Sequence, residues 1–201
     1  MEHNTVSAVL NDEGQDLLFR KARSHKGWLD EPVSDGLLRS VYDLTKMGPT
    51  SANSCPLRMV FVISEEAKAR LIPCVSKGNV DKTMRAPVTI ILGYDTRFYE
   101  LMDRLAPHSP MGPHMAKNPE KAQEFARTQA TLQAAYLIMA ARALGLDCGP
   151  VGGYDAEKTD AAFFPDVRVK SIMLCNLGRG DASLLNPRAA RPVFNEACSI
   201  V

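Results

Sequence analysis

The sequence predicts a single α+β domain, residues 1–201, in which a mixed sheet is flanked by helices. Three observations lead to this class. Stretches rich in β-branched and aromatic residues, at 58–63, 88–93 and 169–177, are typical of buried strands. Helical patterns separate these stretches, and the connections vary too much in length for repeating βαβ units. The third observation is one very long helix, around which we expect the rest of the chain to be arranged.

This central helix is predicted to begin at Asn118-Pro119 and to end at Gly145. No other Pro or Gly interrupts it, so about 26 residues can form a helix of roughly 39 Å. Residues 134–141 are apolar on every face, which is typical of a helix that is buried on all sides. A chain of 201 residues has little core for such a helix. We therefore expect it to lie at the interface of a homodimer.

Composition argues against several classes of partner. The net charge is +1 and no long basic cluster occurs, so we expect no nucleic acid. The apolar half of the central helix is too short to cross a membrane. Five widely spaced cysteines indicate neither a disulfide framework nor a metal site. Because the N-terminus has no signal-peptide pattern, the expected location is a reducing cytoplasm.

The remaining elements follow from helix caps and helix breakers. Residues 1–11 are expected to be a flexible tail, and residues 12–23 a first helix with Leu17 and Leu18 facing inward. Three further helices are expected to begin at the capping residues Ser34, Ser64 and Asp155. Residues 77–82 suggest a polar turn. The proline-rich segment 107–119 suggests a non-helical flap over a site.

Several short motifs carry candidate binding groups. Arg23, Ser24 and His25 could grip a phosphate, although a solvated basic turn is the commoner role of such a cluster. The loop 48–56 is stiffened by prolines and rich in hydroxyl and amide groups. Gly152-Gly153 either forms a plain tight turn or lets a ligand approach the main chain. Residues 178–183 imitate a dinucleotide fingerprint, but too few residues follow for a βαβ unit, so a Rossmann site is rejected.

Taken in order, these motifs resemble the flavin-dependent nitroreductase superfamily. The resemblance covers residues 17–197 and rests on the ordered set, since no single motif is specific. Within the superfamily the motifs are most similar to the malonic semialdehyde reductase branch. The segments that carry the resemblance are Ala22–Trp28, Gly48–Asn53, Gly78-Asn79, Gln133–Ile138, Arg142–Asp147, Gly152–Asp155 and Arg191-Pro192.

The resemblance implies an α+β homodimer that binds FMN at the subunit interface and takes electrons from NADH or NADPH. It places the flavin phosphate and ribityl chain at Arg23, Ser24 and His25, with Arg191, or else Arg188, also on the phosphate. It also implies that the flavin meets Ser51, Asn53, Asn79, Gln133 and the N–H groups of Gly152 and Gly153. Two departures are present: Ala22 stands where many members have a second basic residue, and Gly152 where many have a larger side chain.

The implied activity is ping-pong hydride transfer to a small acceptor, with malonic semialdehyde, reduced to 3-hydroxypropanoate, as one candidate. Because the flavin carries the chemistry, no catalytic side chain is assigned. His108, His114 or water could supply a proton to the acceptor. A broad reductase of nitro compounds and quinones is one alternative. A flavin-binding protein without turnover is the other.

Overall fold

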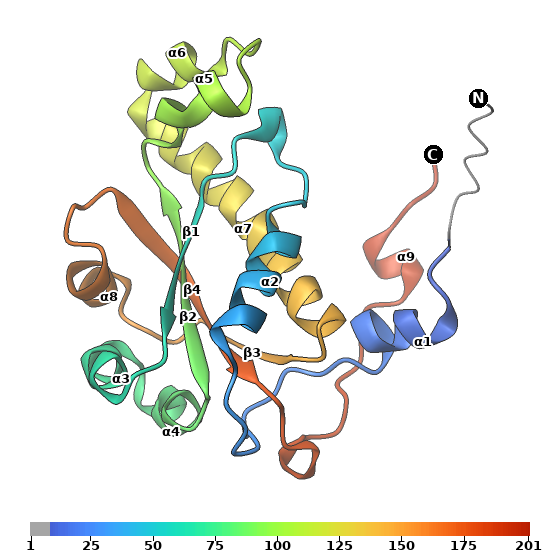
Figure 1. Ribbon diagram of the computed structural model, residues 1–201. Coiled ribbons are helices and arrows are strands. Elements are labelled where there is room, and N and C mark those ends of the chain that lie inside the picture. Colours follow the sequence, from blue (N-terminus) through green and yellow to red (C-terminus); the bar gives the residue numbers. More distant parts are fainter. Residues whose placement is uncertain (1–8) are drawn as a thin grey trace.

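A four-stranded sheet in the order β1-β2-β4-β3 lies at the centre of the computed structural model, which describes residues 9–201 (Figure 1). All three strand pairings are antiparallel, where we expected a mixed sheet. The α+β class is confirmed. The strands are β1 (Leu57–Val62), β2 (Val88–Asp95), β3 (Asp147–Val151) and β4 (Val169–Gly178).

The strand β3 was not predicted, because Gly149 and Pro150 favour a turn. It forms one edge of the sheet, pairing only with β4 among the described strands. At an edge the missing N–H of a proline does not interrupt a ladder between two neighbours, which is why Pro150 is tolerated opposite Cys175. The strand matters for the site, because it runs between two of the predicted binding motifs.

Helices cover both faces of this sheet. Caps at Ser34, Ser64 and Asp155 are confirmed, since each side chain accepts a hydrogen bond from a main-chain N–H three residues later. The helices of residues 9–201 are α1 (Asp12–Gln15), α2 (Asp35–Thr45), α3 (Glu65–Leu71), α4 (Val80–Met84), α5 (Met102–Leu105), α6 (Met111–Ala116), α7 (Pro119–Ala143), α8 (Ala156–Phe163) and α9 (Phe194–Ala197).

The pleat of β2 divides the core into two layers. Ile90 and Leu92 pack with α2 and α7 on one face, whereas Ile91 packs on the other, against the layer of α3 and α8. This alternation follows from the two-residue period of a strand. A third apolar cluster, which includes Phe98 and Met102, lies between α5, α6 and the first half of α7.

The long helix α7 confirms the predicted central element. Alanines at intervals of four form its buried stripe, which lets the helix approach its neighbours closely; they are Ala122, Ala126, Ala130 and Ala134. Leu132, on another face, is 41% exposed. Within one chain the helix is therefore not buried on all sides. The sequence predicts burial on all sides for residues 134–141, with a second subunit as part of the cover.

Three local predictions need correction. The first helix is short: α1 ends at Gln15 and continues as a π-helical turn, Asp16–Arg20, in which Leu17 is 49% exposed instead of inward. The segment 107–119 contains the helix α6, because Pro113 falls in the first turn, where main-chain N–H groups have no helical partner. The expected polar turn at 77–82 leads into the helix α4. Of the expected tail, residues 1–8 lie outside the described part, and residues 9–11 are extended.

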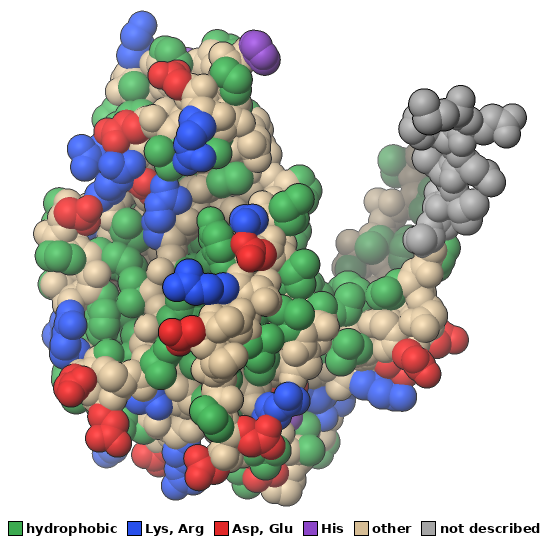
Figure 2. Space-filling view, viewed as in Figure 1, with side chains coloured by type: hydrophobic (Ala, Val, Ile, Leu, Met, Phe, Trp, Pro, Cys, Tyr) green, Lys and Arg blue, Asp and Glu red, His purple; other side chains and the backbone are tan. Residues whose placement is uncertain are grey.

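The two ends of the described chain leave the body of the molecule on the same side (Figure 1). One end carries α1 and its π-helical turn. The other, residues 185–201, carries α9 and is called the C-terminal arm below. Both expose large apolar side chains, including Phe19 at 59% and Phe194 at 57%. Apolar side chains also gather on the flank of the body that faces the arm (Figure 2).

A buried ion-pair network ties the end of β2 to the start of β4. Asp95, which is 1% exposed, accepts hydrogen bonds from Arg58 at 2.7 Å and from Arg168 at 2.8 and 2.9 Å. Burial alone would raise the pKa of Asp95. Hydrogen bonds from the Arg168 side chain and the Arg97 N–H, together with the charges of Arg58 and Arg168, outweigh that effect and hold the pKa of Asp95 below its ordinary value.

Replacing this carboxylate should therefore cost stability at neutral pH. Asp95→Asn is expected to lower the free energy of unfolding by about 3 kcal/mol, because the Arg58 guanidinium loses its carboxylate partner and Arg168 keeps only its ion pair with Glu100. The lowered pKa means that the carboxylate stabilises the fold above its unfolded-state pKa. That contribution disappears as the pH falls through the folded-state pKa, so the difference between variant and wild type should shrink below about pH 4.

Urea unfolding at a series of pH values measures this difference. Asp103→Asn, at an exposed position of α5, is the matched control and should leave stability unchanged. A difference for Asp95→Asn that stays constant down to pH values well below 4 would contradict the assignment.

Candidate functional site

Five arginines surround one cavity at the base of the C-terminal arm. The cavity has a volume of about 520 Å³, and no carboxylate of residues 9–201 lines it. Arg20 is paired with Asp12 and Asp16, but the other four guanidinium groups have no ion pair among the described residues. Such groups around a hollow favour a strongly charged anion such as a phosphate. The residues that line this arginine cavity are Phe19, Arg20, Ala22, Arg23, Ser24, Arg142, Pro187, Arg188, Ala189 and Arg191. The structure thus brings together Arg23, Ser24, Arg188 and Arg191, which the sequence placed on the phosphate.

Hydrogen bonds hold the two walls of the arginine cavity against each other. The Arg23 guanidinium donates to the carbonyl of Asn186 at 2.5 Å, and the Lys26 ammonium donates to the Asn186 side chain at 2.9 Å. In the opposite direction, Arg188 donates to the carbonyl of Ala22 at 2.8 Å. The segment around residue 23 and the C-terminal arm therefore meet although they are far apart in sequence.

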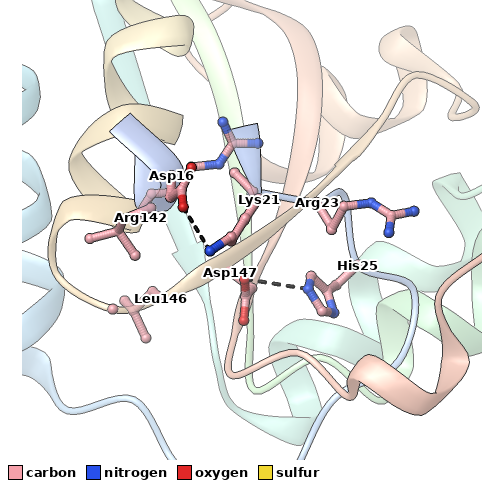
Figure 3. A pocket seen from close by; sticks show the side chains of 10 residues that line it. Asp16, Lys21, Arg23, His25, Arg142, Leu146 and Asp147 are labelled. Carbon is pink, nitrogen blue, oxygen red and sulfur yellow. Dashed lines mark ion pairs between the residues drawn. The ribbon is translucent and has the colours of Figure 1, made fainter. Parts of the chain in front are cut away.

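A second, smaller cavity of about 220 Å³ shares Ala22, Arg23 and Arg142 with the arginine cavity; Figure 3 shows its lining. Here carboxylates accompany the cations. The Lys21 ammonium is 2.7 Å from Asp16, and His25 Nε2 is 3.4 Å from Asp147. Because Asp16 and Asp147 line this smaller cavity, the larger arginine cavity, which no described carboxylate lines, is the better place for a dianion.

His25 does not line the arginine cavity, although its two predecessors do. Its side chain is 6% exposed and turns toward Asp147 (Figure 3). The main-chain N–H of His25 donates to Cys148 at 2.9 Å, which attaches this segment to the start of β3. The imidazole lies beneath the predicted phosphate site instead of in it.

The glycine pair follows the other end of β3. From Cys148, beside Ser24, to Gly152 the strand covers about 13 Å, at roughly 3.3 Å per residue. The Asn79 side chain donates to the Gly153 carbonyl at 2.9 Å, so the structure brings Asn79 next to the pair. A Cβ on Gly153 would lie 2.3 Å from that amide, whereas one on Gly152 would meet open space. Within residues 9–201 neither glycine N–H has a hydrogen-bond acceptor.

The loop with Ser51 and Asn53 lies apart from the arginine cavity. The Ser51 N–H donates to Gln129 of α7 at 2.8 Å, and the Asn53 side chain donates to the Leu105 carbonyl at 2.8 Å. Ala52, at φ 50°, and Asn53, at φ 51°, adopt the left-handed conformation, so the loop is held in a strained shape. Gln129 lies about 20 Å along α7 from Arg142. One chain does not bring this loop to the arginines.

Gln133 faces the sheet. Its side chain is buried and accepts the N–H of Leu57 at 3.0 Å, which supports the first residue of β1. Gln133→Leu should therefore lower the free energy of unfolding by about 1–3 kcal/mol, because a buried N–H loses its acceptor. The Kd for FMN should not change. Gln123→Leu, at an exposed position of α7, is the control for both measurements. A loss of FMN affinity at unchanged stability would instead favour the predicted flavin contact.

Sequence reasoning missed Arg20, Arg142 and Gln129. Arg142 lies in the last turn of α7, and it enters the sequence resemblance only as the first residue of the shared segment Arg142–Asp147, with no binding role. An arginine that closes an apolar helix is a weak signal for a binding wall. No local pattern in the sequence indicates that residues 20, 142 and 191 meet. Among the described residues, no cluster of His, Cys, Asp and Glu side chains is arranged to hold a metal ion. No described helix combines the length and hydropathy that a membrane span requires.

Comparison with known proteins identifies the family. The model of the nitroreductase family matches residues 19–179, a span that includes all four strands and the whole of α7 and that ends before the C-terminal arm. The chain belongs to the nitroreductase family. The resemblance seen in the sequence motifs is thereby confirmed.

Relatives and solved structures agree with this assignment. A protein of Ralstonia nicotianae, provisionally named NADH dehydrogenase/NAD(P)H nitroreductase, is 50% identical over 186 residues, 92% of this chain and 95% of the relative. HadB of Ralstonia pickettii, given the same provisional name, is 51% identical over 187 residues, 91% and 95% of the two chains. The crystal structure of a provisionally named nitroreductase of Exiguobacterium sibiricum in complex with FMN has a TM-score of 0.82. It is 20% identical, with 96% of this chain and 99% of that chain covered. At this identity the likeness shows a shared fold only.

Proposed function

We propose that this nitroreductase is an FMN-dependent oxidoreductase that uses NADH or NADPH to reduce a small acceptor. The observation that carries the proposal is the arginine cavity at one end of β3 and the two free N–H groups at the other. A flavin mononucleotide has a phosphate at one end and a planar ring with acceptor atoms at the other. Relatives at half identity are named for NAD(P)H, and a fold neighbour was solved with FMN.

The residues of the chain fit this cofactor at both ends. Arg23, Ser24 and Arg191 would hold the phosphate, with Arg188 beside them. The N–H groups of Gly152 and Gly153 would meet the ring edge, where Asn79 fixes the position of the pair. The open space beside Gly152 leaves that main chain accessible to a flat ring. When bound, FMN supplies hydride transfer between the nicotinamide and the acceptor.

We propose further that the working form is a homodimer. The exposed apolar side chains of the π-helical turn, of α7 and of the C-terminal arm need a cover; among them are Phe19, Leu132 and Phe194. A second copy would supply that cover. It could also bring its own Ser51 and Asn53 to a cofactor that lies too far from them within one chain. A reducing cytoplasm would suit the five free thiols.

For the acceptor we propose a short semialdehyde such as malonic semialdehyde, on the strength of the sequence motifs shared with that branch. No described side chain identifies itself as the proton donor to the carbonyl oxygen, since His108 and His114 are exposed surface residues. Nitro compounds and quinones are the competing acceptors. A flavin-binding protein without turnover is the competing function.

Anaerobic stopped-flow absorbance separates these outcomes. We expect NADH or NADPH to bleach the FMN-loaded protein, and a semialdehyde to restore the colour in a second, independent half-reaction. Saturation only with a nitroaromatic or a quinone would favour the broad reductase. A flavin that binds but is not bleached by either nicotinamide would favour the protein without turnover, and a ternary-complex pattern would contradict the ping-pong order.

A further inference from the structure

We infer that His25, Asp147 and Gly180 form a unit that positions the C-terminal arm over the proposed phosphate site, with His25 acting as a positioning residue instead of a phosphate ligand. The inference rests on the proposed FMN site and adds the residues that fix the distance between its two walls. None of the three residues lines the arginine cavity itself.

The contacts of Asp147 link the three residues. One carboxylate oxygen lies 3.4 Å from His25 Nε2, and the other accepts the Gly180 N–H at 2.9 Å. Asp147 is the first residue of β3, and the His25 main chain is bonded to the next residue, Cys148. The Asp147 carboxylate therefore connects the segment that carries Arg23 to the turn 179–181, which precedes the C-terminal arm in the chain.

The imidazole of His25 packs directly against the main chain of the turn 179–181. A Cβ on Gly180 would lie 1.9 Å from His25 Nδ1, so only a glycine can lie against the ring. The indole of Trp28 lies beside the ring, tilted by 40° at a centroid distance of 6.3 Å. Two further main-chain bonds fasten the same turn: the Leu29 N–H donates to Arg179 and the Asp181 N–H to Gly27, at 2.9 and 3.0 Å. The position of the imidazole thus fixes the position of residues 179–181.

A direct role on the phosphate fits His25 poorly. Its Nδ1 is buried and has no hydrogen-bond partner among the described residues, so an anion could reach it only after the turn had moved away. Arg23 and Ser24 reach the arginine cavity from the neighbouring positions, and the arm enters it from Asn186 onward. His25 belongs to the first of these walls and contacts, through Asp147, the turn that leads to the second. Its effect on a phosphate would act through the distance between them.

The test compares two flavins that differ only in the phosphate. Dissociation constants for FMN and for riboflavin are measured by flavin fluorescence, on the full chain freed of cofactor. His25→Leu should raise the Kd for FMN at least tenfold and leave the Kd for riboflavin unchanged, because only FMN uses the arginine cavity. His25→Gln, whose amide can still donate toward Asp147, should recover most of the FMN affinity.

Asp147→Ala provides a second, independent route to the same unit. It should raise the Kd for FMN by a similar factor, and the double variant His25→Leu/Asp147→Ala should be no weaker than either single variant, because both changes release the same turn. Thermal unfolding of each variant confirms that it is folded.

Three results would overturn the inference: an unchanged FMN affinity in His25→Leu, an equal loss for FMN and riboflavin, or fully additive effects in the double variant. Should His25→Leu not fold, Asp147→Ala and His25→Gln decide the same question. A wild-type chain that binds no FMN would instead defeat the proposed function, so the two failures are distinguishable.

Discussion

The double variant Arg23→Ala/Arg191→Ala is expected to bind FMN about a thousandfold more weakly than the wild type. Each arginine contributes a charge-assisted hydrogen bond worth about 1.5–3 kcal/mol, and a tenfold change in Kd corresponds to about 1.4 kcal/mol. The two side chains approach the arginine cavity from different walls, so removing both takes one charged donor from each wall, although Arg20, Arg142 and Arg188 remain. Fluorescence titration with FMN measures the loss directly.

Two controls make this result specific. Arg39→Ala, at an exposed position of α2 outside the arginine cavity, should leave the Kd for FMN unchanged. Riboflavin, which has no phosphate, should bind the double variant as well as it binds the wild type. If Arg23→Ala/Arg191→Ala lost riboflavin and FMN equally, the two arginines would act on the fold or on the ring instead of on the phosphate.

Replacing Gly152 with proline should slow flavin reduction by NAD(P)H about tenfold to a hundredfold, whereas alanine at the same position should have little effect. Proline removes the main-chain N–H, which we place at the ring edge, where negative charge develops during hydride transfer. The loss of one such donor is worth about 1.5–3 kcal/mol. Alanine keeps the N–H, and its methyl group would enter open space.

The backbone around residue 152 suits this comparison. Proline restricts the residue before it to extended conformations, and Val151 is already the last residue of β3. The fold should therefore tolerate both variants, which thermal unfolding checks. Equal reduction rates for Gly152→Pro and Gly152→Ala in stopped-flow absorbance would contradict a role of the Gly152 N–H in flavin reduction.

Much of the fold was predictable wherever local signals agree with the final packing. The proline at the start of α7 and the caps of α2, α3 and α8 are local, and all four helices begin where expected. The strand β3 was not predictable, because Gly149 and Pro150 argue against a strand and only pairing with β4 makes one. The exposure of Leu17 and Leu132 has a similar origin, since an apolar pattern does not say whether its cover comes from the same chain.

The candidate site was predictable as a set of motifs and not as a geometry. Arg23 and Arg191 line one cavity, and Asn79 donates a hydrogen bond to Gly153; the flavin contacts that the resemblance implies for them stay predictions. The inward turn of His25 depends on Asp147 and Gly180, which lie more than a hundred residues further along the chain. The loop around Ser51 is distant from the arginines for a different reason, because one chain contains only half of the groove that we propose.

Titration of the cofactor-free chain with FMN, followed by flavin fluorescence and by sedimentation velocity at each step, tests the central claim most directly. We expect saturation at one FMN per chain, on a particle of twice the chain mass, with riboflavin bound far more weakly. A chain that quenches no flavin fluorescence, or one that binds FMN and riboflavin equally well as a monomer, would contradict the account.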